Sequence, residues 1–534
     1  MTSDYSVLPF VPDDPTEIEP WVDEQALRAR PTTIQISLTP TEPIQIQISS
    51  ISHLPNEILI HIFQYAHHEV PHSAYAFPLP IAMAGVCRSW RAVVCRTPEL
   101  WTHVFLTSAT PIDHLQTYLE RSGNFEIHVS FCHWLVHKPD NEVNSSEPFL
   151  EPIVGTLNRH AHRLRSLSLW DVSDMVVCIV MKGLLNFHAP RLTNVSVKAN
   201  HSAYPHYYQL RDLYLLPFLS GGAPSLTHLD IDHLPIETFR MRSDWPFNVQ
   251  SLTSLTLRTQ ECPTLGFFLP PYLIEFPALC ALLRSTPNLM TLALYGPIIE
   301  PDEDFPVRPP GVTLPALETL IIHRRDPGIR YHCELLSVLT TPNLKHLEIP
   351  WHDDLTVELP YANRMTDYLF DGNGQPRFAT VKELYVHNSA TKWKMPTGSF
   401  MVAFPNVEEV VIGGTDVAKF AATLRGFVRP HPVPPACLAR IGRRGSRDPE
   451  SEGVLADGAW QTVRRVVLKE PEMARWKGWV RGFCKWLAAG GHVGQVCIEI
   501  QDGVPREGEL DGRAMTAFKR GLDRLRRHAQ VVIV

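Results

Sequence analysis

The feature that most constrains the fold is a short apolar pattern, L-x-x-L-x-L, that recurs from residue 164 almost to the end of the chain. Leu344, Leu347 and Ile349 carry one copy. Within a copy, apolar and polar residues alternate as they do in a short strand with one buried face. The other copies have their apolar residues at Leu164/Leu167/Leu169, Leu192/Val195/Val197, Leu226/Leu229/Ile231, Leu252/Leu255/Leu257, Leu289/Leu292/Leu294, Leu317/Leu320/Ile322, Val381/Leu384/Val386, Val407/Val410/Ile412, Val463/Val466/Leu468 and Val493/Val496/Ile498.

Successive copies begin 28, 34, 26, 37, 28, 27, 37, 26, 56 and 30 residues apart. Such a step holds one strand, one helix and two turns, and no unit of that size can bury its own apolar stripe, so neighbouring units must stack. The strand pattern and the step length resemble a leucine-rich repeat over roughly two-thirds of the chain. The resemblance implies an α/β fold: an irregular leucine-rich-repeat solenoid with a parallel sheet on its concave face.

Prolines precede many copies by two residues: Pro190, Pro224, Pro287, Pro315, Pro342 and Pro405. A proline has a fixed φ and no N–H, so each one is predicted to end a helix and to start an extended segment. A regular leucine-rich repeat places Asn or Cys three residues after its third apolar position. Asn200 fits this rule, whereas Val172, Leu234, Pro297, Arg325 and His352 do not. We therefore expect an irregular array whose turns are satisfied in another way.

Composition and charge limit the class of protein. Of the 534 residues 44% are hydrophobic, and the formal net charge of −7 favours neither nucleic acid nor an anionic membrane as a partner. The longest apolar run, Met175 to Met181, is too short to span a bilayer. The ten cysteines are scattered without a C-x-x-C pair, which predicts reduced thiols in a cytoplasmic or nuclear protein.

The chain divides into three regions. Residues 1–50 are rich in Pro, Thr and acidic residues and are predicted to be a disordered acidic, Pro-rich arm. Residues 51–102 are predicted to form a small helical domain. Residues 103–534 would form the repeat array, with loop insertions at about 296–314 and 428–458, where prolines are frequent and no copy occurs. A strand, a helix and a strand between His103 and Phe131 would join the array to the helical domain without a flexible linker.

The helical domain is predicted from three blocks. A helix after Leu54-Pro55 has a broad apolar face that includes Ile58 and Ile62, and a second helix runs from about Ile81 to Val94. Thr97 and Pro98 predict a capped turn, with Thr97 as N-cap and Pro98 at the first position. Three short helices bury too little surface to be stable alone, so we expect an apolar face that docks onto a partner.

The blocks L-P-x-E-I-L-x-x-I-F, V-C-R-x-W-R and T-P-E-L-W closely resemble an F-box of the fungal type that accompanies divergent leucine-rich repeats. The resemblance implies binding to the Skp-family adaptor and, through it, to a cullin and a RING subunit. The implied adaptor-binding residues are Leu54, Pro55, Ile58, Leu59, Ile62, Val86, Cys87 and Trp90.

A target-binding face follows from strand geometry. Residues between and just after the second and third apolar positions point away from the buried face of the strand, toward the concave face of the array. Aromatic and charged residues there are the candidates for contact with a target protein. They are Trp170, His228, Asp230, Arg258, Tyr295, His323, His346, Glu348, Tyr385 and His387.

Catalytic motifs are not found: there is no phosphate loop, nucleophile elbow or H-E-x-x-H helix. His67, His68 and His72 offer no fourth metal ligand, and the acidic runs at 302–304 and 352–354 are expected to be solvated turns. We therefore expect no enzyme, cofactor or metal. The F-box resemblance implies a substrate receptor of an SCF-type ubiquitin ligase. The alternative is a leucine-rich scaffold that no longer engages the adaptor.

Overall fold

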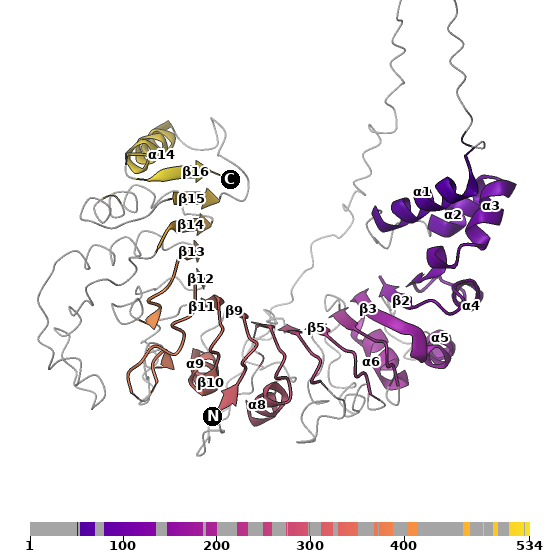
Figure 1. The fold of residues 1–534 in the computed structure, drawn as a ribbon, viewed down its shortest axis with the longest axis horizontal. Coiled ribbons are helices and arrows are strands. Elements are labelled where there is room, and N and C mark those ends of the chain that lie inside the picture. Colours follow the sequence, from indigo (N-terminus) through magenta and orange to yellow (C-terminus); the bar gives the residue numbers. More distant parts are fainter. Residues whose placement is uncertain are drawn as a thin grey trace, which may run out of the picture. The chain divides into compact units, whose positions relative to one another are not determined.

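The structure is a computed structural model in which the chain forms two units, Met1–Pro55 and Asn56–Val534 (Figure 1). Both the predicted arm at 1–50 and the predicted insertion at 428–458 lie outside the described residues. The structure describes residues 51, 54–69, 79–134, 147–184, 188–199, 222–232, 249–258, 274, 276–296, 298, 311–323, 329–350, 368–371, 373–387, 403–413, 463–469, 484, 495–499, 512–527 and 529–533.

The second unit begins with a small group of helices. These are α1 (Asn56–Glu69), α2 (Leu79–Val86), α3 (Arg88–Cys95) and the 3-10 helix η3 (Pro98–Trp101). Leu59 and Phe63 form the buried side of α1, each only 1% exposed. The ring of Phe63 meets the ring of Trp90 from α3 edge to face, with 4.7 Å between the centroids. Aromatic packing of this kind holds α1 against α3.

The prediction of one helix from Ile81 to Val94 was wrong, because the chain breaks at Cys87. This residue is extended, with φ −157° and ψ 170°, and its Sγ accepts a hydrogen bond from the backbone N–H of Trp90. Cys87 is therefore the N-cap of a separate α3. Thr97 is the N-cap residue of η3 with Pro98 following it, as predicted, but its side chain makes no capping hydrogen bond; its hydroxyl donates instead to the carbonyl of Val93 (2.9 Å) at the end of α3.

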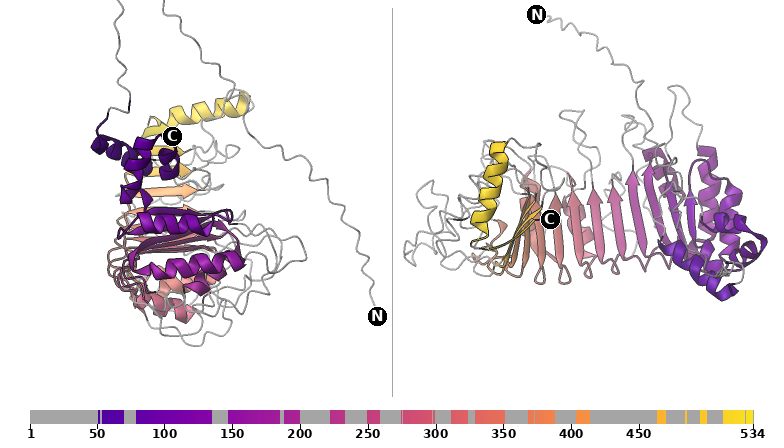
Figure 2. Two further views of the ribbon diagram at one scale, coloured as in Figure 1. Left: turned by 90° about the vertical axis from the view of Figure 1, so that its right-hand side faces the viewer. Right: turned by 90° about the horizontal axis from the view of Figure 1, so that it is seen from above.

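A parallel sheet follows the helices and runs through the rest of the unit. In the described part of the chain it has fourteen strands, and each pairs in parallel with its neighbours. Figure 2 shows the strands side by side along the array. They are β1 (His103–Leu106), β2 (Ile127–Cys132), β3 (Leu164–Val172), β4 (Asn194–Ala199), β5 (His228–Asp232), β6 (Ser254–Arg258), β7 (Thr291–Tyr295), β9 (Thr319–His323), β11 (His346–Pro350), β12 (Glu383–His387), β13 (Glu409–Gly413), β14 (Arg465–Lys469), β15 (Gln495–Glu499) and β16 (Gln530–Ile533).

Within the described residues, helices lie between six pairs of successive strands, and together with the sheet they give the α/β solenoid-like fold expected from the sequence. Part of the predicted loop at 296–314 is instead the strand β8 (Val312–Thr313), which pairs with β10 (Leu339–Thr340). The helices and short 3-10 turn of the described part are α4 (Ile112–Arg121), α5 (Glu147–Arg159), η4 (Ala161–Arg163), α6 (Asp174–Gly183), α8 (Phe276–Arg284), α9 (Ile329–Val338) and α14 (Gly512–Leu525).

The core lies between the sheet and these helices and is built from the repeated apolar triplets. In the eight copies from Leu164 to Val386, every apolar position is 4% exposed or less. Fully burying a Leu, Ile or Val side chain contributes about 1.5–3 kcal/mol, so the triplets are the main source of stability of the array. The side of the sheet opposite the triplets, which we call the open face, carries polar residues such as Ser168, Asp230 and Thr256. In β13, β14 and β15 it carries Val411, Val467 and Cys497, each 1% exposed.

The prolines before the copies form part of a turn. In the turn that precedes β4, the N–H of Leu192 donates to the carbonyl of Ala189 (3.1 Å), which places Pro190 at the second position of a β-turn. A fixed φ near −65° suits that position. The same bond precedes β5, β6, β7, β9, β11 and β12, with N···O distances of 3.0–3.3 Å. The proline thus starts a turn, and the extended segment begins two residues later.

A side-chain hydrogen bond links five turns, those before β5, β6, β7, β11 and β13, to the turn of the preceding copy. The donor directly precedes the first apolar position, and the acceptor is the carbonyl two residues before the first apolar position of the preceding copy. These inter-repeat bonds satisfy carbonyls of the turns that precede the strands. They are Ser225 to Pro190 (2.6 Å), Ser251 to Pro224 (2.6 Å), Asn288 to Gln250 (2.7 Å), Asn343 to Pro315 (2.7 Å) and Asn406 to Ala379 (2.8 Å).

Removing one inter-repeat bond should weaken the array measurably. We expect Asn343→Ala to lower the free energy of unfolding by about 0.5–1.5 kcal/mol, the net value of one hydrogen bond. Asn343→Ser should retain most of the stability, because Ser225 and Ser251 make the same bond in other copies. Urea denaturation of the three proteins measures the difference. Equal destabilisation by Ala and Ser would contradict the assigned role.

The helical group is joined to the array without a linker, as the sequence predicts. Trp101, the last residue of η3, is fully buried, and its ring lies 4.9 Å from that of Tyr118 in α4. Its Nε1 donates to the carbonyl of Val94 (2.9 Å). His67 of α1 also contacts His103 of β1, with 3.0 Å between Nε2 and Nδ1, and the ring of His103 stacks on that of His128 in β2.

Candidate functional site

The first candidate surface is an exposed apolar stripe on α1. Ile58, Ile62 and Tyr65 are 45%, 42% and 69% exposed, and with exposed His61 they occupy positions i, i+3, i+4 and i+7. This spacing places all four on one side of the helix. The opposite side, with Leu59, faces the core. A stripe of large apolar side chains exposed to solvent indicates a surface that binds another protein rather than an ordinary hydrated surface.

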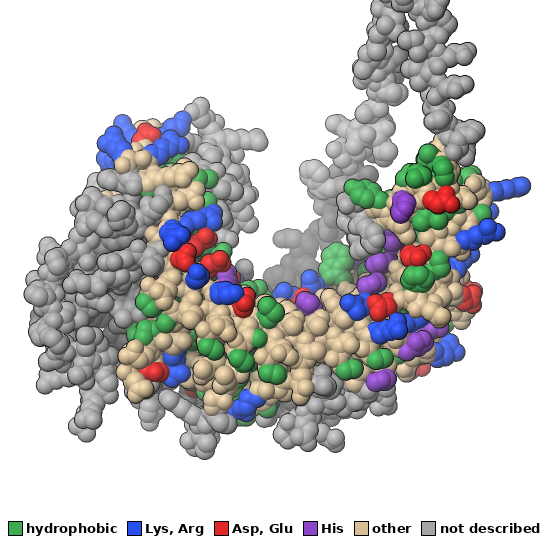
Figure 3. Space-filling model, in the orientation of Figure 1, with side chains coloured by type: hydrophobic (Ala, Val, Ile, Leu, Met, Phe, Trp, Pro, Cys, Tyr) green, Lys and Arg blue, Asp and Glu red, His purple; other side chains and the backbone are tan. Residues whose placement is uncertain are grey.

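Further apolar residues lie on α2. Val86 is 61% exposed and Ile81 is 37% exposed. Cys87 is exposed at the start of α3, and Trp90 is half-buried, packed against Phe63. Hydrophobic side chains are visible on the surface of this helical group in Figure 3. We call Ile58, Ile62, Tyr65, Ile81 and Val86 the helical docking face.

Most of the predicted adaptor-binding residues reach the surface. Leu54, which is half-buried, and Pro55, which is exposed, belong to the first unit, and Ile58, Ile62, Val86, Cys87 and Trp90 belong to the second. Leu59 is the exception: it is 1% exposed, so it supports α1 from inside and does not offer its side chain to a partner. Tyr65 and Ile81 were missed, although the 3.6-residue period from Ile58 would have pointed to Tyr65.

The second candidate surface is the open face of the sheet. Residues at equivalent positions of neighbouring strands lie side by side, about 4.8 Å apart. Every predicted target-binding residue is in a strand, and all are on this face except His387, whose side chain lies outside the described residues. Register brings Asp230 beside Thr256 of the next strand, Arg258 beside Tyr295, and Tyr295 beside His323.

One charged cluster on the open face is centred on Asp230. Arg258 donates to its carboxylate (2.7 Å), and the Nζ of Lys198 is 4.0 Å away from it. The Arg258 guanidinium also lies over the Tyr295 ring, 5.0 Å from the centroid. The pKa of Tyr295 is raised, chiefly by burial and then by the charge of Glu348, although Arg258 acts in the opposite direction. Lys198 and Arg258 are thus both close to the Asp230 carboxylate.

A second cluster is centred on His346. Its Nδ1 lies 3.0 Å from the carboxylate of Glu383, and its Nε2 lies 3.9 Å from that of Glu348. The ring of Tyr385 is 4.6 Å from the imidazole. The interaction with the Glu348 carboxylate is the largest cause of a raised pKa for His346; burial opposes it, and Glu383 adds to it. Two carboxylates therefore flank one titratable group.

We expect the pKa of His346 to fall when these carboxylates are neutralised. In wild-type protein an NMR titration of the imidazole should give a pKa above 6.5, and Glu348→Gln should lower it more than Glu383→Gln. Because the folded-state pKa is raised, the contribution of His346 to stability is complete below its unfolded pKa. It is lost as the pH rises through the folded-state pKa. An unchanged pKa in both variants would contradict this arrangement.

Trp170 is separate from these clusters. It is 42% exposed, and its ring lies 5.3 Å from that of His133 in the neighbouring strand segment. The register between β3 and β4 shifts just after Trp170, next to Asp171, which has a positive φ of 53°. The side chain of Asp171 contacts His133, which also has a positive φ, of 47°. The contact between Asp171 and His133 stabilises the register shift between β3 and β4.

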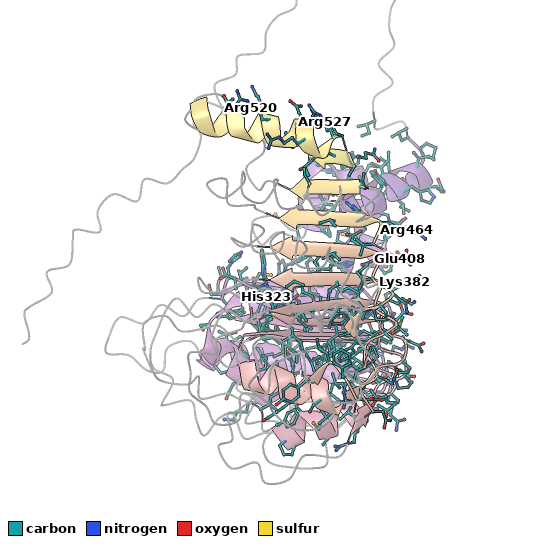
Figure 4. All side chains as sticks on the ribbon, turned by 90° about the vertical axis from the view of Figure 1, so that its left-hand side faces the viewer. His323, Lys382, Glu408, Arg464, Arg520 and Arg527 are labelled. Carbon is teal, nitrogen blue, oxygen red and sulfur yellow. The ribbon has the colours of Figure 1, made fainter. Side chains whose placement is uncertain are left out.

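Charged residues also follow the edge at which the strands begin. Lys345 contacts Glu318 (2.6 Å), and Glu408 contacts both Lys382 (3.0 Å) and Arg464 (3.9 Å). Figure 4 shows Lys382, Glu408 and Arg464 in succession along this edge, and Figure 3 shows acidic and basic side chains gathered there. The hydrogen bond from Lys382 lowers the pKa of Glu408. We call these five residues the strand-start edge.

The described residues limit the chemistry in other ways. Within them no group of three His, Cys, Asp or Glu side chains is placed to hold a metal ion. Among the helices of the described ranges, none combines the length and the hydropathy needed to cross a bilayer. Cys132 and Cys280 are buried free thiols, and burial raises the pKa of each to about 11. Such thiols are poor nucleophiles at neutral pH.

Comparison with known proteins bears on the helical group alone. No curated protein matches the chain. A protein-family model described as F-box-like matches residues 51–107, which include α1, α2, α3, η3 and β1. The match covers the helical docking face and the buried Trp101, and it ends directly after β1, the first strand of the sheet. The chain therefore carries an F-box-like domain, a module for protein–protein interaction, at the start of its α/β array.

Proposed function

We propose that the chain is a substrate-recognition subunit of an SCF-type cullin–RING ubiquitin ligase. The F-box-like domain docks the Skp-family adaptor, which connects the chain to a cullin and a RING subunit. The array binds a target protein through the open face of its sheet. The chain supplies position and no bond-making group, so it acts by raising the local concentration of the target near an associated conjugating enzyme.

The helical docking face is the observation that carries this proposal. Ile58, Ile62 and Tyr65 stand out from one side of α1 while Leu59 and Phe63 hold the other side in the core. A domain that needed no partner would leave fewer large apolar side chains in solvent. Burial of these side chains against the adaptor would supply the binding free energy, at about 25 cal/mol for each Å² of apolar surface removed from water.

The fusion of the two parts supports the receptor role. Trp101 packs against Tyr118, so the F-box-like domain and the first strand and helix of the array share one core. A target bound on the array would then be held at a defined distance from the ligase. A flexible connection would spread the target over a larger volume and lower its effective concentration.

Purified full-length protein and purified Skp-family adaptor test the first half of the proposal. The two should co-elute from a sizing column and should bind with an affinity in the micromolar range or tighter. Addition of the cullin and RING subunits should give a larger complex that retains the chain. Absence of any adaptor binding by folded protein would overturn the ligase assignment and leave a repeat scaffold.

A further inference from the structure

We propose that an exposed basic face on α14 binds an acidic segment, a short run of Asp or Glu residues, of a partner protein. The helix lies at the C-terminal end of the array, beside β16. The inference goes beyond the proposed function, because it adds a second contact surface and depends neither on adaptor binding nor on what the open face binds. The basic face of α14 consists of the exposed residues Lys519, Arg520, Arg524, Arg526 and Arg527.

Helical spacing gathers three of the arginines on one side of α14. Arg520, Arg524 and Arg527 occupy positions i, i+4 and i+7. This spacing continues past the end of α14, because the N–H of Arg526 donates to the carbonyl of Leu522 (2.9 Å). Figure 3 shows basic side chains gathered over α14, and Figure 4 shows Arg520 and Arg527 along it.

Acidic groups of the described residues neutralise little of this charge. Asp523 is the acid on α14 with a resolved partner, and its carboxylate lies 3.7 Å from Arg526. In the described part of the chain, no carboxylate is within ion-pair distance of Arg520, Arg524 or Arg527. Arg524 lies near the thiol of Cys484, but burial raises the pKa of that thiol although Arg524 opposes the shift, so the thiol is neutral at pH 7. Three guanidinium groups are thus available to an anion from outside.

The arrangement is unfavourable for the helix on its own. Arg520 and Arg524 are a like-charge pair at i, i+4, and Arg524 and Arg527 are another at i, i+3. Each such pair destabilises a helix by about 0.2–0.5 kcal/mol. The helix dipole stabilises cations in the last turn, which accounts for Arg524 but not for Arg520, five residues before the end of α14. A bound anion would remove the repulsion between the guanidinium groups.

The other side of α14 argues against a membrane as the partner. A basic amphipathic helix binds a membrane surface by placing its apolar side among the lipids. In α14 the apolar residues Leu522 and Leu525 are only 6% and 0% exposed, because they are part of the core. The helix therefore offers lipid its charged side alone.

The charge of the whole chain argues against nucleic acid. Double-stranded DNA carries one negative charge for about every 1.7 Å of its length, and tight binding requires that many phosphates be neutralised. A chain with a net charge of −7 repels such a polymer more strongly than it repels a short segment with a few carboxylates. An acidic protein segment is the anion that this small basic face fits best.

The spacing of the arginines matches an extended segment. Arg520 and Arg524 are about 6 Å apart along the helix axis, and Arg520 and Arg527 are about 10.5 Å apart. Alternate residues of an extended chain are about 6.7 Å apart and point to the same side. Acidic residues at alternate positions over about five residues would therefore reach all three guanidinium groups, each of which can bind a carboxylate through two N–H groups.

Two labelled peptides test the inference on the full-length protein. One has ten residues with Glu at three alternate central positions and Gly or Ser elsewhere, and its companion has Gln in place of Glu. Fluorescence anisotropy at physiological salt should show the Glu peptide binding at least about ten-fold more tightly, or by about 1.4 kcal/mol, with an affinity that falls as salt is added. Equal binding of the two peptides, or no binding of either, would overturn the inference without the need for any variant.

Substitution of the three arginines locates the binding site. Arg520→Gln/Arg524→Gln/Arg527→Gln should weaken binding of the Glu peptide on the order of ten-fold. The substitutions are at exposed positions, so the array should remain folded, which circular dichroism verifies.

A charge-matched control separates the basic face of α14 from the general field of the molecule. Lys345→Gln/Lys382→Gln/Arg464→Gln removes three exposed cations from the strand-start edge, where each contacts a carboxylate. This variant should bind the Glu peptide within about two-fold of wild type. Equal losses in the two triple variants would show that net charge alone governs binding and would overturn the assigned site.

Two further measurements address other occupants. Tighter binding of a labelled ten-nucleotide DNA strand than of the Glu peptide, lost in the triple arginine variant, would assign the face to nucleic acid and overturn the proposal. Asp13→Asn/Asp14→Asn/Glu17→Gln neutralises acids near the N-terminus and should change binding of the Glu peptide by less than about three-fold. A larger gain would identify that acidic segment of the same chain as the occupant and overturn the assignment to a partner protein.

Discussion

An Ile58→Asp variant should lose binding to the Skp-family adaptor by at least about a hundred-fold, or about 2.7 kcal/mol, while the array stays folded. Ile58 is 45% exposed in the middle of the helical docking face, so the substitution removes a side chain that a partner would bury. It also places a carboxylate where docking would take it out of water. Calorimetric titration of adaptor into wild-type and variant protein measures the loss.

The control for this prediction is Met290→Asp. Met290 is 44% exposed, almost the same as Ile58, but it precedes β7 in the array and is remote from α1 in the sequence. Met290→Asp should bind the adaptor as wild type does. Near-wild-type adaptor binding by Ile58→Asp would show that the stripe on α1 is not the docking face. Circular dichroism of both variants establishes that each protein is folded.

A Trp101→Ala variant should be destabilised by about 3–5 kcal/mol, the typical cost of removing a buried Trp side chain. Trp101 is fully buried, and its ring contacts Tyr118 and lies under the Arg121 guanidinium (4.3 Å to the centroid). Its loss also leaves the carbonyl of Val94 without the indole N–H. The F-box-like domain should unfold first, because Trp101 joins its last helix to α4 of the array.

Trp170→Ala is the matched comparison, because Trp170 is 42% exposed and its removal creates no internal cavity. It should cost less than about 1 kcal/mol. Trp101→Phe should fall between the two, since an aromatic ring is kept and the bond to Val94 is lost. Denaturant unfolding monitors stability, and limited proteolysis at residues 56–101 reports on the F-box-like domain. Similar midpoints for Trp101→Ala and Trp170→Ala would contradict the shared core.

The repeat pattern alone predicted the alternation of strands and helices and the buried side of each strand. This was possible because an L-x-x-L-x-L copy has only one way to bury its three apolar residues, and Leu317, Leu320 and Ile322 are all fully buried. The F-box-like blocks predicted the helical domain equally well. Pro55 directly precedes the first helix of the domain, and Trp101 ends the last one. The strand β8 was missed because two residues, Val312 and Thr313, carry no periodic signal.

Other features depend on information that is not local in the sequence. Ile58 and Leu59 are adjacent apolar residues on one helix, and only the packing of Phe63 on Trp90 decides which of them is buried. The helix break at Cys87 follows from a side-chain cap that competes with continuation of the helix. Glu348 and Glu383 are 35 positions apart, and they share His346 only because register aligns β11 with β12.

The inter-repeat bonds have a consequence for how such a chain can change in length. Asn343 and its equivalents engage only the turn of the preceding copy, immediately before a strand. The number of residues between the end of one strand and the next turn does not enter this geometry, so steps of 26 and 37 residues can coexist in one sheet. Duplication or deletion of a complete copy would leave each remaining donor with an equivalent acceptor. The protein can therefore be lengthened or shortened in whole modules, and its reach toward a partner can be adjusted without redesign of its interior.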